Sequence, residues 1–265
     1  MPLAGGTLVT LIAILWSSAA LWQLTQPWQS PTEREVLDRT WQGFRGYTTW
    51  EETPVDMTTL VLTRQSLHGV AELVLAGPQY RQSGTIRLRA VPGGFATTKP
   101  PDVAVNGDLL LTSGRPLGKL TGVTYAELAA AAGIVAGAPE GLYSEGSGVT
   151  ADDRVHVDPQ AAMVIARALG DGDAALRRFA PGMTPVLWPE HFDIGVTLDE
   201  VNYGVSPGDR HIPEPYAYVS PGQPRTGQFW NISFGAARPL TQLPYTEAIY
   251  EFFDEGRRRA HGEEP

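Results

Sequence analysis

The stretch from Pro185 to Asp209, PVLWPEHFDIGVTLDEVNYGVSPGD, carries the clearest strand pattern in the chain. Side chains in a strand point alternately to its two faces, so alternation of apolar and polar residues predicts a strand with one buried face. His191 and Asp193 would leave the other face together. The alternating positions are Phe192, Ile194, Val196 and Leu198 on one face and His191, Asp193, Gly195 and Thr197 on the other.

The regions on either side of this strand predict an α+β domain, with an antiparallel sheet and flanking helices. Apolar residues recur at helical spacing over residues 57–76, and Gly77-Pro78 is expected to end that helix. Asn106-Gly107 separates two short apolar runs, which indicates a β-hairpin. The other expected elements are a strand over 85–91, helices over 124–132, 158–169 and 174–179 with a glycine break at 170–172, a long loop over 200–214, strands over 216–219 and 229–234, and a helix over 240–258.

The first 32 residues contain no charged side chain, and residues 8–24 form an apolar run at the short limit for a membrane span. Three interpretations stay open: a single N-terminal membrane-anchor helix of undetermined orientation, a cleaved signal peptide, or a soluble segment of a cytoplasmic protein. The expected organisation is an apolar segment over 1–32, a linker with a short helix over 33–56, one domain over 57–260 and a tail over 261–265.

Composition excludes several classes of protein. The chain has 265 residues, enough to bury a core without covalent staples, and it contains no cysteine, so disulfide scaffolds, thiolate zinc sites and thiol nucleophiles are excluded. Its formal net charge of -9 argues against nucleic-acid binding, which needs clustered Lys and Arg.

His191, Asp193 and Glu200 are the candidate catalytic residues. A histidine beside a carboxylate can form an acid–base pair, or it can bind a metal while the carboxylate orients it. His191 and Asp193 are therefore also candidate ligands of a divalent ion such as zinc, manganese or iron. This hypothesis of a metal-dependent enzyme, with hydrolysis among its reactions, requires the three side chains to converge within about 5 Å.

The favoured hypothesis is a binding domain for a small molecule or a protein partner, with an aromatic and acidic cleft within residues 185–239. The competing structural interpretation is that His191 ties a loop to the strand, that Asn202 and Asp209 cap turns, and that both tryptophans belong to the core. The candidate ligand-binding residues are Trp188, Asn202, Tyr203, Asp209, Tyr216 and Trp230.

The motifs of this stretch resemble those of an uncharacterised bacterial family, DUF5996. They are Trp188-Pro-Glu-His-Phe-Asp193, Ser206-Pro-Gly-Asp209 and Glu214-Pro-Tyr-Ala-Tyr-Val219, and the similarity extends over residues 58–255. The composition is similar to that of an actinobacterial relative. The resemblance implies no activity, but it implies that the His-Phe-Asp strand and the Pro-Gly loop belong together.

Overall fold

The computed structural model describes residues 55–143 and 145–262, which fall within one compact unit of the chain. The expected N-terminal anchor over residues 8–24 lies outside the described residues. Within the described ranges, no helix is long and apolar enough to cross a membrane.

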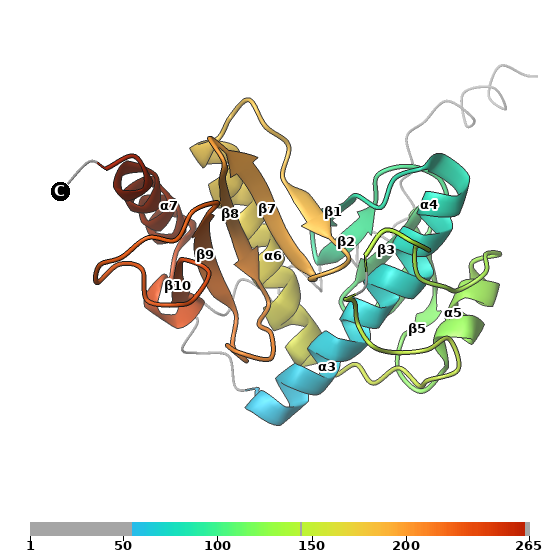
Figure 1. Cartoon of the computed structure of the whole chain (residues 1–265). Coiled ribbons are helices and arrows are strands. Elements are labelled where there is room, and N and C mark those ends of the chain that lie inside the picture. Colours follow the sequence, from blue (N-terminus) through green and yellow to red (C-terminus); the bar gives the residue numbers. More distant parts are fainter. Residues whose placement is uncertain (1–54, 144, 263–265) are drawn as a thin grey trace, which may run out of the picture. The chain divides into compact units, whose positions relative to one another are not determined.

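The described strands form one antiparallel sheet, which confirms the predicted α+β class (Figure 1). The strands are β1 (Leu88–Val91), β2 (Gly94–Thr97), β3 (Val103–Asn106), β4 (Leu109–Thr112), β5 (Arg115–Lys119), β6 (Val186–Trp188), β7 (Asp193–Leu198), β8 (Val201–Ser206), β9 (Tyr216–Pro221) and β10 (Ala236–Pro239). Their order across the sheet is β10-β9-β8-β7-β6-β1-β2-β3-β4-β5.

The first described helix continues past its expected end, so the predicted stop at Gly77-Pro78 is wrong. The Gly77 N–H bonds to the carbonyl of Glu72, five residues back, which is π-helical geometry. Pro78 then falls in the first turn of the next helix, where its missing N–H costs little, and the chain leaves the helix at Gly84 with φ 70°. The successive segments are α3 (Met57–Gly69), η2 (Val70–Ala76) and α4 (Gly77–Ser83).

Helix α6 (Pro159–Phe179) is continuous, so the predicted glycine break at 170–172 is also wrong. A Cβ on Gly172 would lie 2.7 Å from the Cβ of Val205 and 3.0 Å from the Cγ2 of Ile194. The missing side chain therefore lets the helix pack closely on β7 and β8. This contact offsets the loss of about 1 kcal/mol that a glycine costs inside a helix.

Strand β8 occupies part of the region expected to be a loop, residues 200–214. It is joined to β7 by Asp199 and Glu200, whose φ angles of 51° and 63° are both positive, as a two-residue hairpin turn requires. The predicted strand over 229–234 is wrong for a different reason. In the described structure the last strand, β10, begins at Ala236. The tight turn between Ile232 and Gly235 occupies the expected strand.

The sequence patterns that predicted helix starts and one hairpin are confirmed. Thr124 and Glu127 form the expected capping box at α5 (Tyr125–Ala131), and Asp158 caps α6. Asn106-Gly107 begins the turn between β3 and β4. Near the C-terminus, η3 (Leu240–Gln242) precedes α7 (Thr246–Ala260), whose buried residues include Ile249, Phe252 and Phe253 as expected.

Helices α6 and α7 cover one face of β7, β8 and β9. Ile194, Val205 and Val219 point to this face, because they meet the close-packed glycines of the two helices. Since side chains alternate, Asp193 and Tyr218 point to the opposite face of the sheet. Helix α3 and η2 contribute polar side chains to that opposite side.

Candidate functional site

Arg64, His68 and Glu72 are spaced four residues apart along α3 and η2, so they form a polar stripe on one side of the helix. The Nε2 of His68 lies 2.7 Å from the carbonyl oxygen of Pro189 and donates to it. The imidazole also stacks on Phe192, with ring centroids 5.6 Å apart. The stripe is thereby attached to the turn between β6 and β7.

Burial lowers the pKa of His68, although the Pro189 carbonyl and the charge of Glu72 oppose the shift. The imidazole is therefore neutral at pH 7. Because Nε2 carries the proton that is donated to the carbonyl, Nδ1 holds the lone pair.

Glu72 is buried in the π-helical segment, with 5% of its surface exposed. One carboxylate oxygen accepts from the backbone N–H of Ser147 at 2.8 Å and from its hydroxyl at 2.5 Å. The Tyr143 hydroxyl is buried nearby without a hydrogen-bond partner among the described residues. Burial and the charge of Glu72 raise the pKa of Tyr143, which is therefore a neutral donor.

Asp193 begins β7 and is 8% exposed, a deeply buried position for a carboxylate. The Tyr218 hydroxyl donates a short hydrogen bond to its Oδ2. The Tyr218 ring lies across two glycines on neighbouring strands, because a Cβ on Gly204 would be 2.5 Å from the Tyr218 hydroxyl and one on Gly195 would be 3.1 Å from it. The two glycines thus provide the space that the tyrosine needs to reach Asp193.

The turn residues Glu190 and His191 connect the two halves of the site. Burial raises the pKa of Asp193, while the Tyr218 hydrogen bond and the charge of His191 oppose the shift. Glu190 acts electrostatically on both Asp193 and Tyr143. We call this group of side chains the polar cluster: Arg64, His68, Glu72, Tyr143, Glu190, His191, Asp193 and Tyr218.

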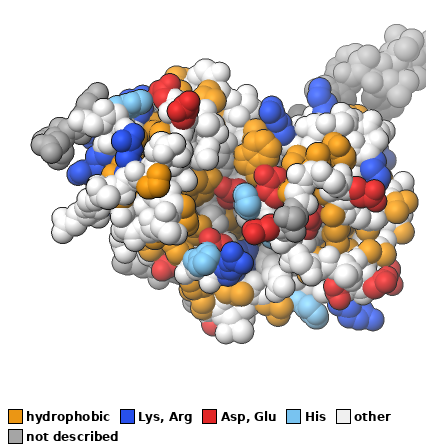
Figure 2. All heavy atoms as spheres, in the orientation of Figure 1, with side chains coloured by type: hydrophobic (Ala, Val, Ile, Leu, Met, Phe, Trp, Pro, Cys, Tyr) orange, Lys and Arg blue, Asp and Glu red, His pale blue; other side chains and the backbone are white. Residues whose placement is uncertain are grey.

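An open cavity of about 530 Å³ lies at the Glu72 end of the polar cluster. Figure 2 shows acidic and histidine side chains gathered around a hollow in the middle of the displayed face. The residues that line the cavity are Glu72, Leu73, Ala138, Pro139, Tyr143, Glu145, Gly146, Gly148, Val149 and Arg210.

The structure brings several predicted residues to this side of the sheet. His191 is exposed in the turn before β7, and Trp188 stands opposite Asp193 in the β6–β7 pairing. The Tyr216 hydroxyl donates to Oδ2 of Asp209 at 2.7 Å. Asp209 also accepts from the backbone N–H groups of His211 and Ile212, so it caps a turn, as in the structural interpretation.

Three predicted residues lie away from the polar cluster. Glu200 is exposed in the turn at the far end of β7, beyond about 17 Å of strand, so it does not converge with Asp193. Asn202 is exposed near that end and accepts from the Thr197 hydroxyl at 2.6 Å. Tyr203 points into the core on the α6 side, where its ring packs against Phe179 at a centroid distance of 4.6 Å.

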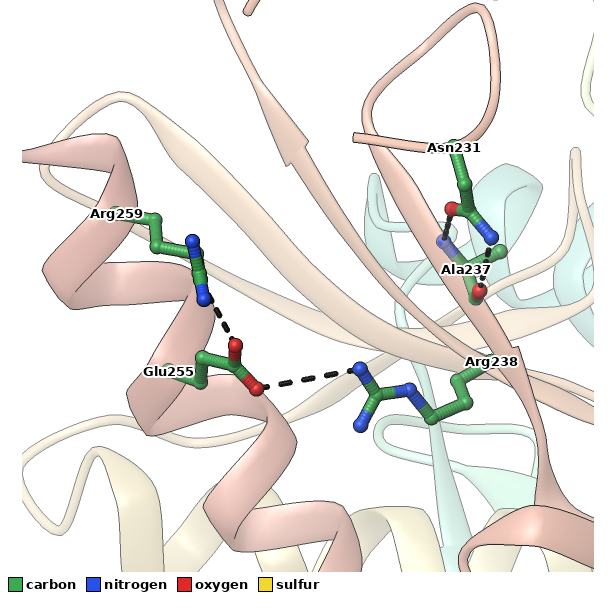
Figure 3. Close-up of polar contacts among 5 residues, drawn as sticks. All are labelled: Asn231, Ala237, Arg238, Glu255 and Arg259. Atoms are coloured by element: carbon green, nitrogen blue, oxygen red, sulfur yellow. Dashed lines mark hydrogen bonds and ion pairs between the residues drawn. The ribbon is translucent and has the colours of Figure 1, made fainter. Parts of the chain in front are cut away.

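Trp230 packs against the hydrophobic core, in the loop beside α7. Figure 3 shows how this region is held: the Asn231 amide bonds the backbone of Ala237 at 2.9 and 3.0 Å, and Glu255 pairs with Arg238 and Arg259. The Asn231 contacts attach the loop to β10, and the Arg238–Glu255 pair connects β10 to α7.

Among the described residues, no group of three or more His, Cys, Asp or Glu side chains is arranged to hold a metal ion. The metal-ligand role of His191 and Asp193 stays a prediction, as does the identity of any cofactor. Comparison with known protein families, with curated proteins and with solved structures found no match. The resemblance to DUF5996 therefore also stays a prediction.

Sequence reasoning missed most residues of the polar cluster. The pattern around Asp193 located one side of the site, but Arg64, His68 and Glu72 were not among the candidates. Their spacing of four was the available signal, because it places the three ionisable groups on one side of the helix.

Proposed function

We propose that this domain binds a small polar molecule at the polar cluster and the adjoining cavity. Ligand sites are concave and combine a few convergent polar groups with titratable residues whose pKa is perturbed. The cluster meets this description with side chains from α3, η2, the β6–β7 turn, β7 and β9.

The observation that carries the proposal is the association of the cavity with a buried carboxylate in a π-helical segment. Glu72 lines the cavity of about 530 Å³ although only 5% of its surface is exposed. Short π-helical segments are rare and occur frequently at functional sites. Tyr143 lines the same cavity, and its hydroxyl supports the proposal as a buried neutral donor beside the Glu72 carboxylate.

The proposal is tested by filling the cavity. Ala138→Trp places a large side chain in the cavity wall, and Ala130→Trp makes the same change at an exposed position of α5. A library of small polar compounds is screened for stabilisation of the full chain against thermal unfolding. We expect compounds that stabilise the wild type and Ala130→Trp to lose their effect on Ala138→Trp. Compounds that stabilise all three chains equally would contradict binding in the cavity.

A second candidate function is acid–base catalysis on the bound molecule. Its support is that burial shifts the pKa of His68 downward and that of Asp193 upward within one cluster. Opposite shifts of this kind separate a base from an acid at one pH. The test is a screen for hydrolysis of chromogenic esters and amides. An activity that survives Glu200→Gln but not Asp193→Asn supports this candidate, and equal activity in both variants refutes it.

A further inference from the structure

One carboxylate oxygen of the polar cluster lacks the partner that its burial requires. Asp193 is 8% exposed, its Oδ2 accepts from Tyr218, and its Oδ1 is buried with no hydrogen bond from any described residue. A buried acceptor without a donor costs free energy that a ligand supplying the donor would recover.

The direction of this oxygen is set by the sheet. Ile194 faces α6, because its Cγ2 would be 3.0 Å from a Cβ on Gly172. Asp193, one residue earlier, therefore points to the opposite face, where His191 and Glu190 act on its carboxyl group. Since Tyr218 fixes Oδ2, the carboxyl group has a defined orientation, and Oδ1 is the oxygen that remains for a ligand on this side.

The charges around Asp193 favour a cationic donor. Glu72 and Glu190 add two further carboxylates to the cluster. The guanidinium of Arg64 donates to the backbone carbonyls of Pro213 at 2.8 Å and Asp209 at 3.2 Å, so these hydrogen bonds direct it toward the loop over 209–213. His68 is held neutral by burial, which lowers its pKa. His191 opposes part of this potential as a positive charge near Asp193, and Arg210 lines the adjoining cavity. The four carboxylates of Glu72, Glu145, Glu190 and Asp193 still outnumber these two side chains together with Arg64.

Aromatic rings supply a second feature that suits a cation. The Tyr218 ring packs edge-to-face with Phe234, with centroids 6.4 Å apart, and lies tilted against the Tyr216 ring at 6.3 Å. An organic ammonium group is attracted to the faces of such rings as well as to a carboxylate. Anionic ligands would meet repulsion from Glu72, Glu190 and Asp193.

We infer that the ligand of the polar cluster is a small organic amine, whose ammonium group donates to Oδ1 of Asp193. This assignment rests on the proposed function, because it names the chemical class of the molecule that the cluster binds. Asp193 is the counter-ion, Tyr218 orients its carboxylate, and Glu72 and Glu190 add the negative potential that selects a cation.

The experiment compares three probes with the same carbon chain and different head groups: n-butylamine, n-butanol and n-butyrate. Binding to the full chain is measured at constant pH and ionic strength by the shift in thermal unfolding temperature over a concentration series. Magnesium chloride is a fourth arm, which distinguishes an organic ammonium from an inorganic cation. The variants are Asp193→Asn and Glu200→Gln, and the latter removes one carboxylate from the turn beyond the far end of β7.

We expect n-butylamine to stabilise the wild type and Glu200→Gln, and Asp193→Asn to weaken its binding about tenfold or more, as loss of a charged hydrogen bond should. Equal affinity for wild type and Asp193→Asn would overturn the assignment of Asp193. Should Asp193→Asn not fold, the order of the head groups on the wild type decides the ligand class.

Two results separate this inference from the proposed function. Stabilisation by n-butanol, n-butyrate or magnesium in preference to n-butylamine refutes the amine and leaves a binding site of another class. Absence of stabilisation by all four probes and by the library of polar compounds refutes both proposals.

Discussion

The hydrogen bond from Tyr218 to Asp193 makes a prediction that a double-mutant cycle can test. Tyr218→Phe removes one hydroxyl and leaves the ring lying across Gly195 and Gly204, so little apolar contact is lost. A hydrogen bond to a charged group contributes about 1.5–3 kcal/mol to the free energy of unfolding, and one between neutral groups contributes about 0.5–1.5 kcal/mol. We therefore expect Tyr218→Phe to cost about 2 kcal/mol in the wild type and about 1 kcal/mol in the Asp193→Asn chain.

The difference of about 1 kcal/mol is the coupling energy between the two side chains. It is measured by urea unfolding of the wild type, both single variants and the double variant at about pH 8, where the carboxyl group is ionised to the greatest extent that stability allows. Because burial also raises the pKa of Tyr218, its hydroxyl stays a neutral donor at that pH.

Tyr216→Phe is the matched control. It removes a hydroxyl that donates to Asp209 at 2.7 Å, on the same strand and two residues away. Asp209 is ionised at this pH and keeps its backbone donors, so this change should cost about 1.5–2 kcal/mol and should be independent of Asp193→Asn. An equal cost of Tyr218→Phe in both backgrounds would refute the claim that the hydroxyl stabilises a charged Asp193.

Four further predictions concern the pH dependence and the packing of the described domain. Burial raises the pKa of Asp193 above 3.8, so the folded state keeps the carboxyl proton to a higher pH than the unfolded state does. The free energy of unfolding should therefore fall as pH rises from about 4 through the folded pKa. Urea titrations of Asp193→Asn should lack this decline. Burial also opposes ionisation of Asp209, but hydrogen bonds from the backbone and from Tyr216 outweigh burial and lower its pKa. The contribution of Asp209 to the free energy of unfolding should therefore be lost as pH falls below about 4. Asp209→Asn should not show this loss of stability in acid. On α6, Gly172→Ala should cost about 1–3 kcal/mol, because the added methyl group meets side chains of β7 and β8. Gly170→Ala meets nothing within 4 Å and should stabilise the domain by about 0.5–1 kcal/mol. Equal urea midpoints for the two variants would refute the close-packing argument. Gln79→Leu should cost about 3 kcal/mol or more, because the buried amide of Gln79 bonds backbone groups just before β1 and just after β2. A cost below about 1 kcal/mol in thermal unfolding would contradict that role.

The sequence predicted only part of the polar cluster, namely His191 and Asp193. Alternation of side chains located Asp193, and its short distance from His191 along the chain placed the two residues near one another. Glu200 did not converge with them because a strand separates residues by about 3.3 Å each, whatever their nearness in sequence suggests. His68 meets the backbone of Pro189 from 121 positions away, a proximity that no local pattern contains.

The sequence by itself determined those features whose energy comes from neighbouring residues. The capping box at Thr124 and the Asn106-Gly107 turn depend on hydrogen bonds and φ angles within four residues, so their patterns were sufficient. The alternating pattern of β7 was sufficient for a strand, because one buried face imposes a period of two.

Tertiary structure alone decided the features whose energy comes from distant contacts. The glycine at 172 reads as a break until β7 and β8 are packed on the helix, where the absence of a side chain becomes favourable. In the sequence, the spacing of Arg64, His68 and Glu72 is that of a solvent-facing helix surface. In the structure, the β6–β7 turn packs on it through the contact of His68 with Pro189. Burial then changes the pKa of His68 and Asp193, because the cost of a charge depends on what surrounds it in three dimensions.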